Sequence, residues 1–172
     1  YAKRNLEDYN GAIADNTKAL ELNPNYALAY YIRGYAKHRL KDYYGAIVDY
    51  TKAIELNPYA LAYYNRGIAK RNLKDYYGSI ADYTKAIELN PNYALAYYNR
   101  GYSKHIVKDY YGAIADYTKA IELNTPNDAD AYYNRGVSKE GIGDLKGACK
   151  DWRKAASLGY SNSAKWVRNQ CN

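Results

Sequence analysis

A six-residue string recurs four times along the chain at nearly constant intervals. It reads AYYIRG at residues 29–34 and AYYNRG at residues 62–67, 96–101 and 131–136, so its glycines lie 33, 34 and 35 residues apart. A second string, DYYGAIADYTKAIELN or a variant of it, begins at Asp8, Asp42, Asp75, Asp109 and Asp144. A repeat of this length is one supersecondary unit that buries its apolar face only against its neighbours. The sequence therefore predicts an array of stacked repeats.

Each repeat is predicted to be a pair of helices. In the second string, apolar residues recur on one helical face, as at Ala46, Tyr50 and Ala53. An Asp stands just before this helix, where its carboxylate can cap free backbone N–H groups. A Pro follows the helix and disfavours helical conformation in the residue before it. The caps are expected at Asp42, Asp75, Asp109 and Asp144, and the helix ends before Pro24, Pro58 and Pro91.

The small and aromatic residues of the repeat match a known family. The pattern has an aromatic residue at place 4, Gly at 8, Ala at 20, an aromatic at 24, Ala at 27 and Pro at 32, and it resembles the tetratricopeptide repeat. In the repeat that begins at residue 60, these places hold Tyr63, Gly67, Ser79, Tyr83, Ala86 and Pro91. The resemblance implies an all-α fold, an α-solenoid of antiparallel helix pairs in a right-handed superhelix with a C-terminal capping helix. The Tyr-rich variant seen here, with Arg at place 7 and Lys at place 11, is similar to tetratricopeptide proteins of photosynthetic bacteria.

The repeats divide the chain into a single array over residues 1–172. One residue is missing after Pro58 and one is added around Thr125, so two turns between repeats should be irregular. The first hairpin has no cap of its own, and Asn16 stands where other repeats have Tyr or Trp. The expected boundaries are 1–26 for a truncated repeat, 27–59, 60–93 and 94–128 for full repeats, 129–160 for a degraded repeat and 161–172 for the capping helix.

Charge and composition reduce the classes of function that the chain can have. The net charge of +7 favours anionic partners. No stretch without a charged side chain exceeds eleven residues, so no membrane span is expected. The two histidines, His38 and His105, lie two repeats apart with no nucleophile in a recognisable setting. We therefore expect no enzyme, no cofactor and no metal site. The compartment stays open, with the cytoplasm as the default expectation and any targeting segment outside the sequence.

A binding face is predicted on the first helix of each repeat, where places 5, 9 and 12 share one side. The resemblance implies that this side lines the concave groove of the superhelix, which would be aromatic at its floor and basic along one margin. The alternative for the tyrosines is packing between neighbouring hairpins. The residues concerned are Tyr31, Tyr64, Tyr98 and Tyr133 at place 5, Tyr35 and Tyr102 at place 9, and His38, Arg71 and His105 at place 12.

Place 6 carries Asn65, Asn99 and Asn134, while Ile32 interrupts the series. A primary amide offers a donor and an acceptor side by side, which matches a peptide group. Peptide-binding members of the family use Asn at this place to hold an extended ligand backbone, so the resemblance implies the same role here. The alternative is an exposed helical Asn without a role.

Two further pairings are expected. Arg66 and Asp82 lie 16 residues apart, as do Arg100 and Asp116, and Arg135 and Asp151, so Arg to Asp ion pairs are predicted inside the hairpins. Cys149 and Cys171 come opposite each other if the chain turns near Tyr160. Either a disulfide or two reduced, partly buried thiols fits that arrangement.

Three functions remain after these exclusions. The first is a non-catalytic adaptor that binds an extended peptide or a partner's tail, of acidic or aromatic character, in a basic, Tyr-lined groove. The second is a homo-oligomer that stacks through its uncapped first hairpin. The third and least supported is a single-stranded nucleic-acid binder, whose mark would be strong loss of binding with salt.

Overall fold

The computed structural model describes residues 2–123 and 128–171, and every regular element in them is an α-helix. The chain divides into two compact halves, Tyr1–Asn90 and Pro91–Asn172. The N-terminal half contains α1 (Ala2–Leu22), α2 (Ala27–Arg39), α3 (Tyr43–Leu56), α4 (Ala60–Asn72) and α5 (Tyr76–Leu89). The C-terminal half contains α6 (Ala94–Ile106), α7 (Tyr110–Glu122), α8 (Asp128–Gly141), α9 (Leu145–Ser157) and α10 (Ser161–Gln170).

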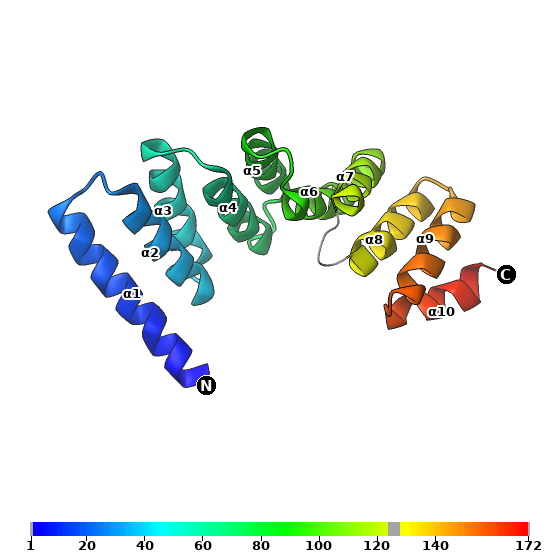
Figure 1. Cartoon of the computed structure of the whole chain (residues 1–172), viewed down its shortest axis with the longest axis horizontal. Coiled ribbons are helices and arrows are strands. Elements are labelled where there is room, and N and C mark those ends of the chain that lie inside the picture. The colour runs from blue at the N-terminus through cyan, green and yellow to red at the C-terminus, as the bar shows by residue number, and fades with distance from the viewer. Residues whose placement is uncertain (1, 124–127, 172) are drawn as a thin grey trace. The chain divides into compact units, whose positions relative to one another are not determined.

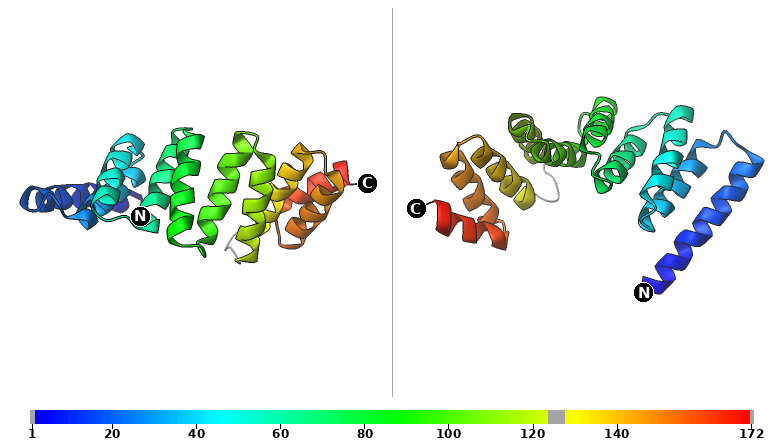
Figure 2. Two further views of the ribbon diagram at one scale, coloured as in Figure 1. Left: turned by 90° about the horizontal axis from the view of Figure 1, so that it is seen from above. Right: turned by 180° about the vertical axis from the view of Figure 1, so that it is seen from behind.

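The helices pair in chain order. In the N-terminal half, α2 packs on α3 and α4 on α5, with α1 against α2 (Figure 1). In the C-terminal half, α6 packs on α7 and α8 on α9, and α10 follows α9 and packs against it (Figure 2). Successive helix pairs of this kind are the architecture of an α-solenoid. None of the helices described is long and apolar enough to cross a membrane.

The predicted ends of the second helices are confirmed. The carboxylates of Asp42, Asp75, Asp109 and Asp144 each accept a hydrogen bond of 2.9 Å from the backbone N–H of a Gly three residues later. Helices α1, α3 and α5 end at Leu22, Leu56 and Leu89, before the prolines. Local chemistry therefore sets both ends of these helices.

Small residues allow the two helices of a hairpin to cross closely. A methyl group at Gly67 would lie 2.7 Å from Cε1 of the buried Tyr83. At Gly136 the same methyl would lie 2.5 Å from Nε1 of Trp152. The Gly at place 8 and the aromatic residue at place 24 are therefore complementary parts of one contact.

The turn between α3 and α4 is irregular, as the missing residue predicts. Tyr59, which precedes α4, has extended backbone angles of φ −146° and ψ 152°. Tyr26, at the equivalent position before α2, has φ −84° and ψ 87°. The second predicted irregularity, around Thr125, lies outside the described residues.

The first repeat differs from the expectation of a hairpin. Residues 2–22 form the single helix α1, which runs through the place where the later repeats turn. In those repeats the turn places Lys41, Lys74 and Lys108 at φ 64–66°, a conformation that L-residues adopt at a cost.

Candidate functional site

The tyrosines predicted at place 5 pack inside their own repeats. The ring of Tyr31 lies 5.8 Å from that of Tyr50 and 5.5 Å from that of Tyr59. Tyr64 and Tyr98 make the same contact with the Tyr at place 24 of their repeats, at 5.8 and 5.7 Å. Each of these place-5 rings is half-buried, so it packs between helices and still presents an edge to solvent. Burial raises the pKa of the Tyr31 hydroxyl, so the group is a neutral hydrogen-bonding phenol.

Tyr133, the last place-5 residue, meets the C-terminal helix. Its ring lies 4.7 Å from that of Tyr160, and its hydroxyl accepts a hydrogen bond from Trp166. The tyrosines at place 9 are more open, with Tyr35 39% and Tyr102 36% exposed.

The asparagines at place 6 do not behave alike. The side-chain N–H of Asn65 donates to the Tyr31 hydroxyl at 2.8 Å, and that of Asn134 donates to the Tyr98 hydroxyl at 3.0 Å. Each of these bonds joins one repeat to the place-5 Tyr of the repeat before it. Asn99 is buried and donates to the Leu95 carbonyl of its own helix at 2.9 Å. Asn65 and Asn134 therefore orient the place-5 tyrosines, a role that spacing alone did not indicate.

The two histidines at place 12 favour the neutral ring, whereas Arg71 at the same place is a cation. His38 lies beside Tyr43, with ring centroids 5.3 Å apart, and its Nε2 is 3.2 Å from the amide nitrogen of Asn72. His105 contacts Tyr110 at the same centroid distance, and its Nδ1 is 2.9 Å from the Ser138 hydroxyl. Burial is the main cause that lowers the pKa of both histidines. Arg71 is the cation at this place in the third repeat, and it is half-buried.

The predicted Arg to Asp pairs are confirmed, and each has a third member. Arg66 binds Asp82 through two hydrogen bonds of 2.9 and 2.7 Å, and Lys70 Nζ lies 2.8 Å from the same carboxylate. We call this group of Arg at place 7, Lys at place 11 and Asp at place 23 the ion cluster of a repeat. The four clusters are Arg33–Lys37–Asp49, Arg66–Lys70–Asp82, Arg100–Lys104–Asp116 and Arg135–Lys139–Asp151.

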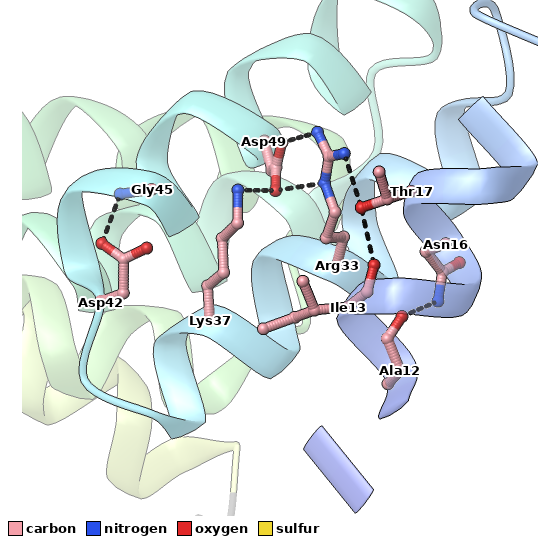
Figure 3. A network of polar contacts seen from close by, with 9 residues as sticks. All are labelled: Ala12, Ile13, Asn16, Thr17, Arg33, Lys37, Asp42, Gly45 and Asp49. Carbon is pink, nitrogen blue, oxygen red and sulfur yellow. Dashed lines mark hydrogen bonds and ion pairs between the residues drawn. The ribbon is translucent and has the colours of Figure 1, made fainter. Parts of the chain in front are cut away.

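The ion clusters also connect neighbouring repeats. Figure 3 shows Arg33 between Asp49 of its own hairpin and Thr17 of α1, whose hydroxyl accepts from Arg33 at 3.2 Å. Arg66 donates to Thr51 at 2.9 Å in the same way. Much of the basic charge that was expected to line the groove is therefore paired with Asp inside the hairpins. Each ion cluster still has a net positive charge, because two cations share one carboxylate.

An open pocket of about 400 Å³ lies beside Tyr31 in the N-terminal half. It forms at the shortened turn between α3 and α4, and its walls are mainly apolar. The lining residues are Ala27, Leu28, Tyr31, Asn57, Tyr59 and Leu61. Sequence reasoning found Tyr31 and the missing residue after Pro58 but did not connect them. The sequence did contain a signal for the pocket, because the missing residue lies between two first helices that both have Leu at place 2, Leu28 and Leu61.

The two cysteines form a disulfide. Cys149 of α9 and Cys171 after α10 are bonded, with their Cα atoms 5.6 Å apart. The sequence left this alternative open beside two reduced thiols. Among the described residues, no group of three or more His, Cys, Asp or Glu side chains is placed to hold a metal ion.

These features define a class of protein, a helical-repeat protein built from successive packed helix pairs. Two sequence profiles of the tetratricopeptide repeat match the chain, one over residues 27–59 and 60–93 and the other over 82–115. The chain belongs to the tetratricopeptide repeat family, whose members are non-catalytic protein-interaction scaffolds. The comparison with curated proteins finds no match.

Solved structures agree with this assignment. The crystal structure of MamA is 30% identical, covers 91% of both chains and superposes with a TM-score of 0.84. YrrB, described as a TPR protein with an unusual peptide-binding site, is 25% identical over 90% of this chain and 80% of its own, with a TM-score of 0.82. The first TPR domain of Spaghetti (RPAP3), bound to the HSP90 peptide SRMEEVD, is 28% identical over 68% of this chain and 93% of its own, with a TM-score of 0.65.

Proposed function

We propose that this chain is a scaffold that binds an extended peptide segment of a partner protein on the first-helix face of its N-terminal half. The observation that carries the proposal is the apolar pocket beside Tyr31. Leu28 and Leu61 at its walls are 49% and 43% exposed, which leaves apolar surface for an aliphatic or aromatic side chain of the peptide to cover.

The hydrogen bonds around the pocket support a preformed site. Asn65 fixes the Tyr31 hydroxyl from the next repeat, and Tyr59 packs on the Tyr31 ring at 5.5 Å. A wall held from two repeats loses little conformational freedom when a ligand binds, which favours affinity. YrrB and the RPAP3 domain, both similar in fold, support a peptide as the kind of ligand.

We further propose that the preferred peptide is acidic. The chain has a net charge of +7, and each ion cluster holds two cations against one carboxylate. The peptide bound to the RPAP3 domain has two Glu and one Asp against one Arg. Electrostatic attraction of this kind acts mainly on the association rate and weakens with salt.

A peptide array tests the proposal. We expect the chain to retain peptides that combine an apolar anchor with acidic residues, and Leu28→Ser with Leu61→Ser to lose most of that binding. Leu22→Ser is the matched control, because Leu22 is 89% exposed and lies on α1, outside the pocket. Equal retention by the pocket variant and the control would contradict the proposed site. Retention that is indifferent to acidic residues and to salt would contradict only the acidic preference.

A further inference from the structure

The C-terminal helix covers the binding face of the last repeat. Tyr133 and Val137 occupy places 5 and 9 of α8. Both pack against a cluster formed by Ala148, Cys149 and Trp152. From the C-terminal segment, Trp166, Val167 and Cys171 pack against the same cluster. In the second and fourth repeats place 9 holds the exposed residues Tyr35 and Tyr102, and in the third it holds the half-buried Ile68.

The contact between α10 and α8 is specific. The Tyr160 ring lies 4.7 Å from the Tyr133 ring, and Trp166 donates a hydrogen bond to the Tyr133 hydroxyl. Trp166 also stacks on Trp152, with ring centroids 5.2 Å apart. The side chain that would contact a peptide in the last repeat is therefore occupied by the chain's own C-terminal segment.

The disulfide is the strongest constraint on this segment. Helix α10 has ten residues, and a helix of that length is marginal in water without tertiary contacts. Beyond the aromatic contacts, the end of the segment is tied by the Cys149–Cys171 bond and by a hydrogen bond of 2.9 Å from Arg153 to the Cys171 carbonyl. Arg153 is exposed, so this hydrogen bond competes with water.

We propose that α10 is a redox-gated cover, which the Cys149–Cys171 disulfide holds over Tyr133 and Val137 and which reduction by a dithiol releases. Release lengthens the first-helix face by one repeat within the C-terminal half. The peptide role of the uncovered face rests on the proposed function above, whereas the movement of the cover does not.

The chemistry of release is ordinary thiol–disulfide exchange. A thiolate of the dithiol attacks the Sγ atom of Cys171, which is half-buried, whereas Cys149 is only 6% exposed. The mixed disulfide forms and Cys149 leaves as a thiolate, which takes up a proton. The second thiol of the dithiol then displaces Cys171, so one disulfide is reduced and one dithiol is oxidised.

Tryptophan fluorescence tests the cover directly, since the chain has two Trp and both lie at this contact. The full chain is compared oxidised and after treatment with dithiothreitol, with the double variant Cys149→Ser and Cys171→Ser as the reductant-insensitive reference. We expect reduction to shift the emission to the red, to increase quenching by acrylamide and to raise the affinity for the apolar dye anilinonaphthalene sulfonate about tenfold, as the open population grows. Trp166→Phe should abolish most of the spectral shift, which assigns it to α10.

Two results would overturn the gate. One is identical emission and dye binding in the oxidised and reduced chains, because α10 would then stay in place without the bond. The other is a large loss of helical circular dichroism on reduction, because the C-terminal half would then unfold as a whole. The array result from the oxidised chain is independent of both, so failure of the proposed peptide site and failure of the gate can be told apart.

Discussion

Tyr50, Tyr83 and Tyr117 are almost completely buried where the helices of a hairpin cross, in a chain that contains no phenylalanine. Among the described residues, the Tyr50 hydroxyl has no hydrogen-bond partner, and burial raises its pKa. A buried polar atom without a partner lowers stability, because it gives up its hydrogen bonds to water. The Tyr50 ring stabilises the hairpin by packing, whereas its buried hydroxyl lowers the stability.

Replacing Tyr50 by Phe should therefore stabilise the fold. We expect Tyr50→Phe to raise the free energy of unfolding by about 1 kcal/mol, since the ring contacts remain and an unsatisfied hydroxyl is removed. Urea denaturation followed by circular dichroism measures the change. Tyr44→Phe is the control, because Tyr44 is 74% exposed and its hydroxyl reaches water. A loss of stability in Tyr50→Phe alone would show that the hydroxyl has a partner, such as an ordered water.

The two kinds of carboxylate on α5 allow a second residue-level prediction. Asp82 is 3% exposed and binds Arg66 and Lys70, whereas Glu88 is exposed and pairs with Lys85 at 2.6 Å. Removing one partner of a buried ion group leaves its other charges uncompensated. We expect Asp82→Asn to lower the free energy of unfolding by about 3 kcal/mol. Glu88→Gln should leave the denaturation midpoint unchanged, and equal effects of the two variants would contradict the structural role of the ion cluster.

At the scale of the helix, the sequence predicts what is decided locally. The Asp caps and the helix ends before Pro depend on residues within one repeat, and both predictions are confirmed. The pocket beside Tyr31 was not predicted, because it depends on how two successive first helices approach across a shortened turn. The contact of α10 with Tyr133 was missed for the same reason, since an aromatic cluster formed from three helices leaves no periodic signal.

The Gly at place 8 gives a prediction that belongs to the helix pair. Gly67→Ala should lower the free energy of unfolding by about 1–3 kcal/mol, because the new methyl group meets Tyr83 at 2.7 Å and forces α4 and α5 apart. Gly11→Ala is the matched control, since a methyl group there has no atom within 4 Å. In helix α1 this control should raise stability by about 0.5–1 kcal/mol. Thermal or urea unfolding of both variants should show changes of opposite sign in the free energy of unfolding. A destabilised Gly11→Ala would contradict the argument.

At the scale of the whole molecule, each half repeats one plan with small departures that bear on function. One residue is missing after Pro58, at the turn where the pocket lies, and Cys149 and Cys171 bond only in the last repeat. The stacking contacts recur with the repeat period and were predictable from it. The departures mark where the surfaces differ chemically, and they are the positions from which the peptide site and the cover are inferred.

The histidines predict how the stability of the chain depends on pH. Burial lowers the pKa of His38 and His105 in the folded chain below the unfolded value, so the folded state favours the neutral ring. Above the unfolded pKa of about 6.5 both states are neutral and the full stability is present. As the pH falls through that value, the unfolded chain binds protons first, and the free energy of unfolding decreases until the folded pKa values are passed.

Urea denaturation tests this pH dependence. Between pH 7.5 and pH 5, the range in which histidines titrate, the urea concentration at the midpoint should fall as the pH is lowered. His38→Gln with His105→Gln keeps hydrogen-bonding groups near Asn72 and Ser138 and should flatten the profile over this range. A profile of unchanged slope in the double variant would assign the pH dependence to other groups.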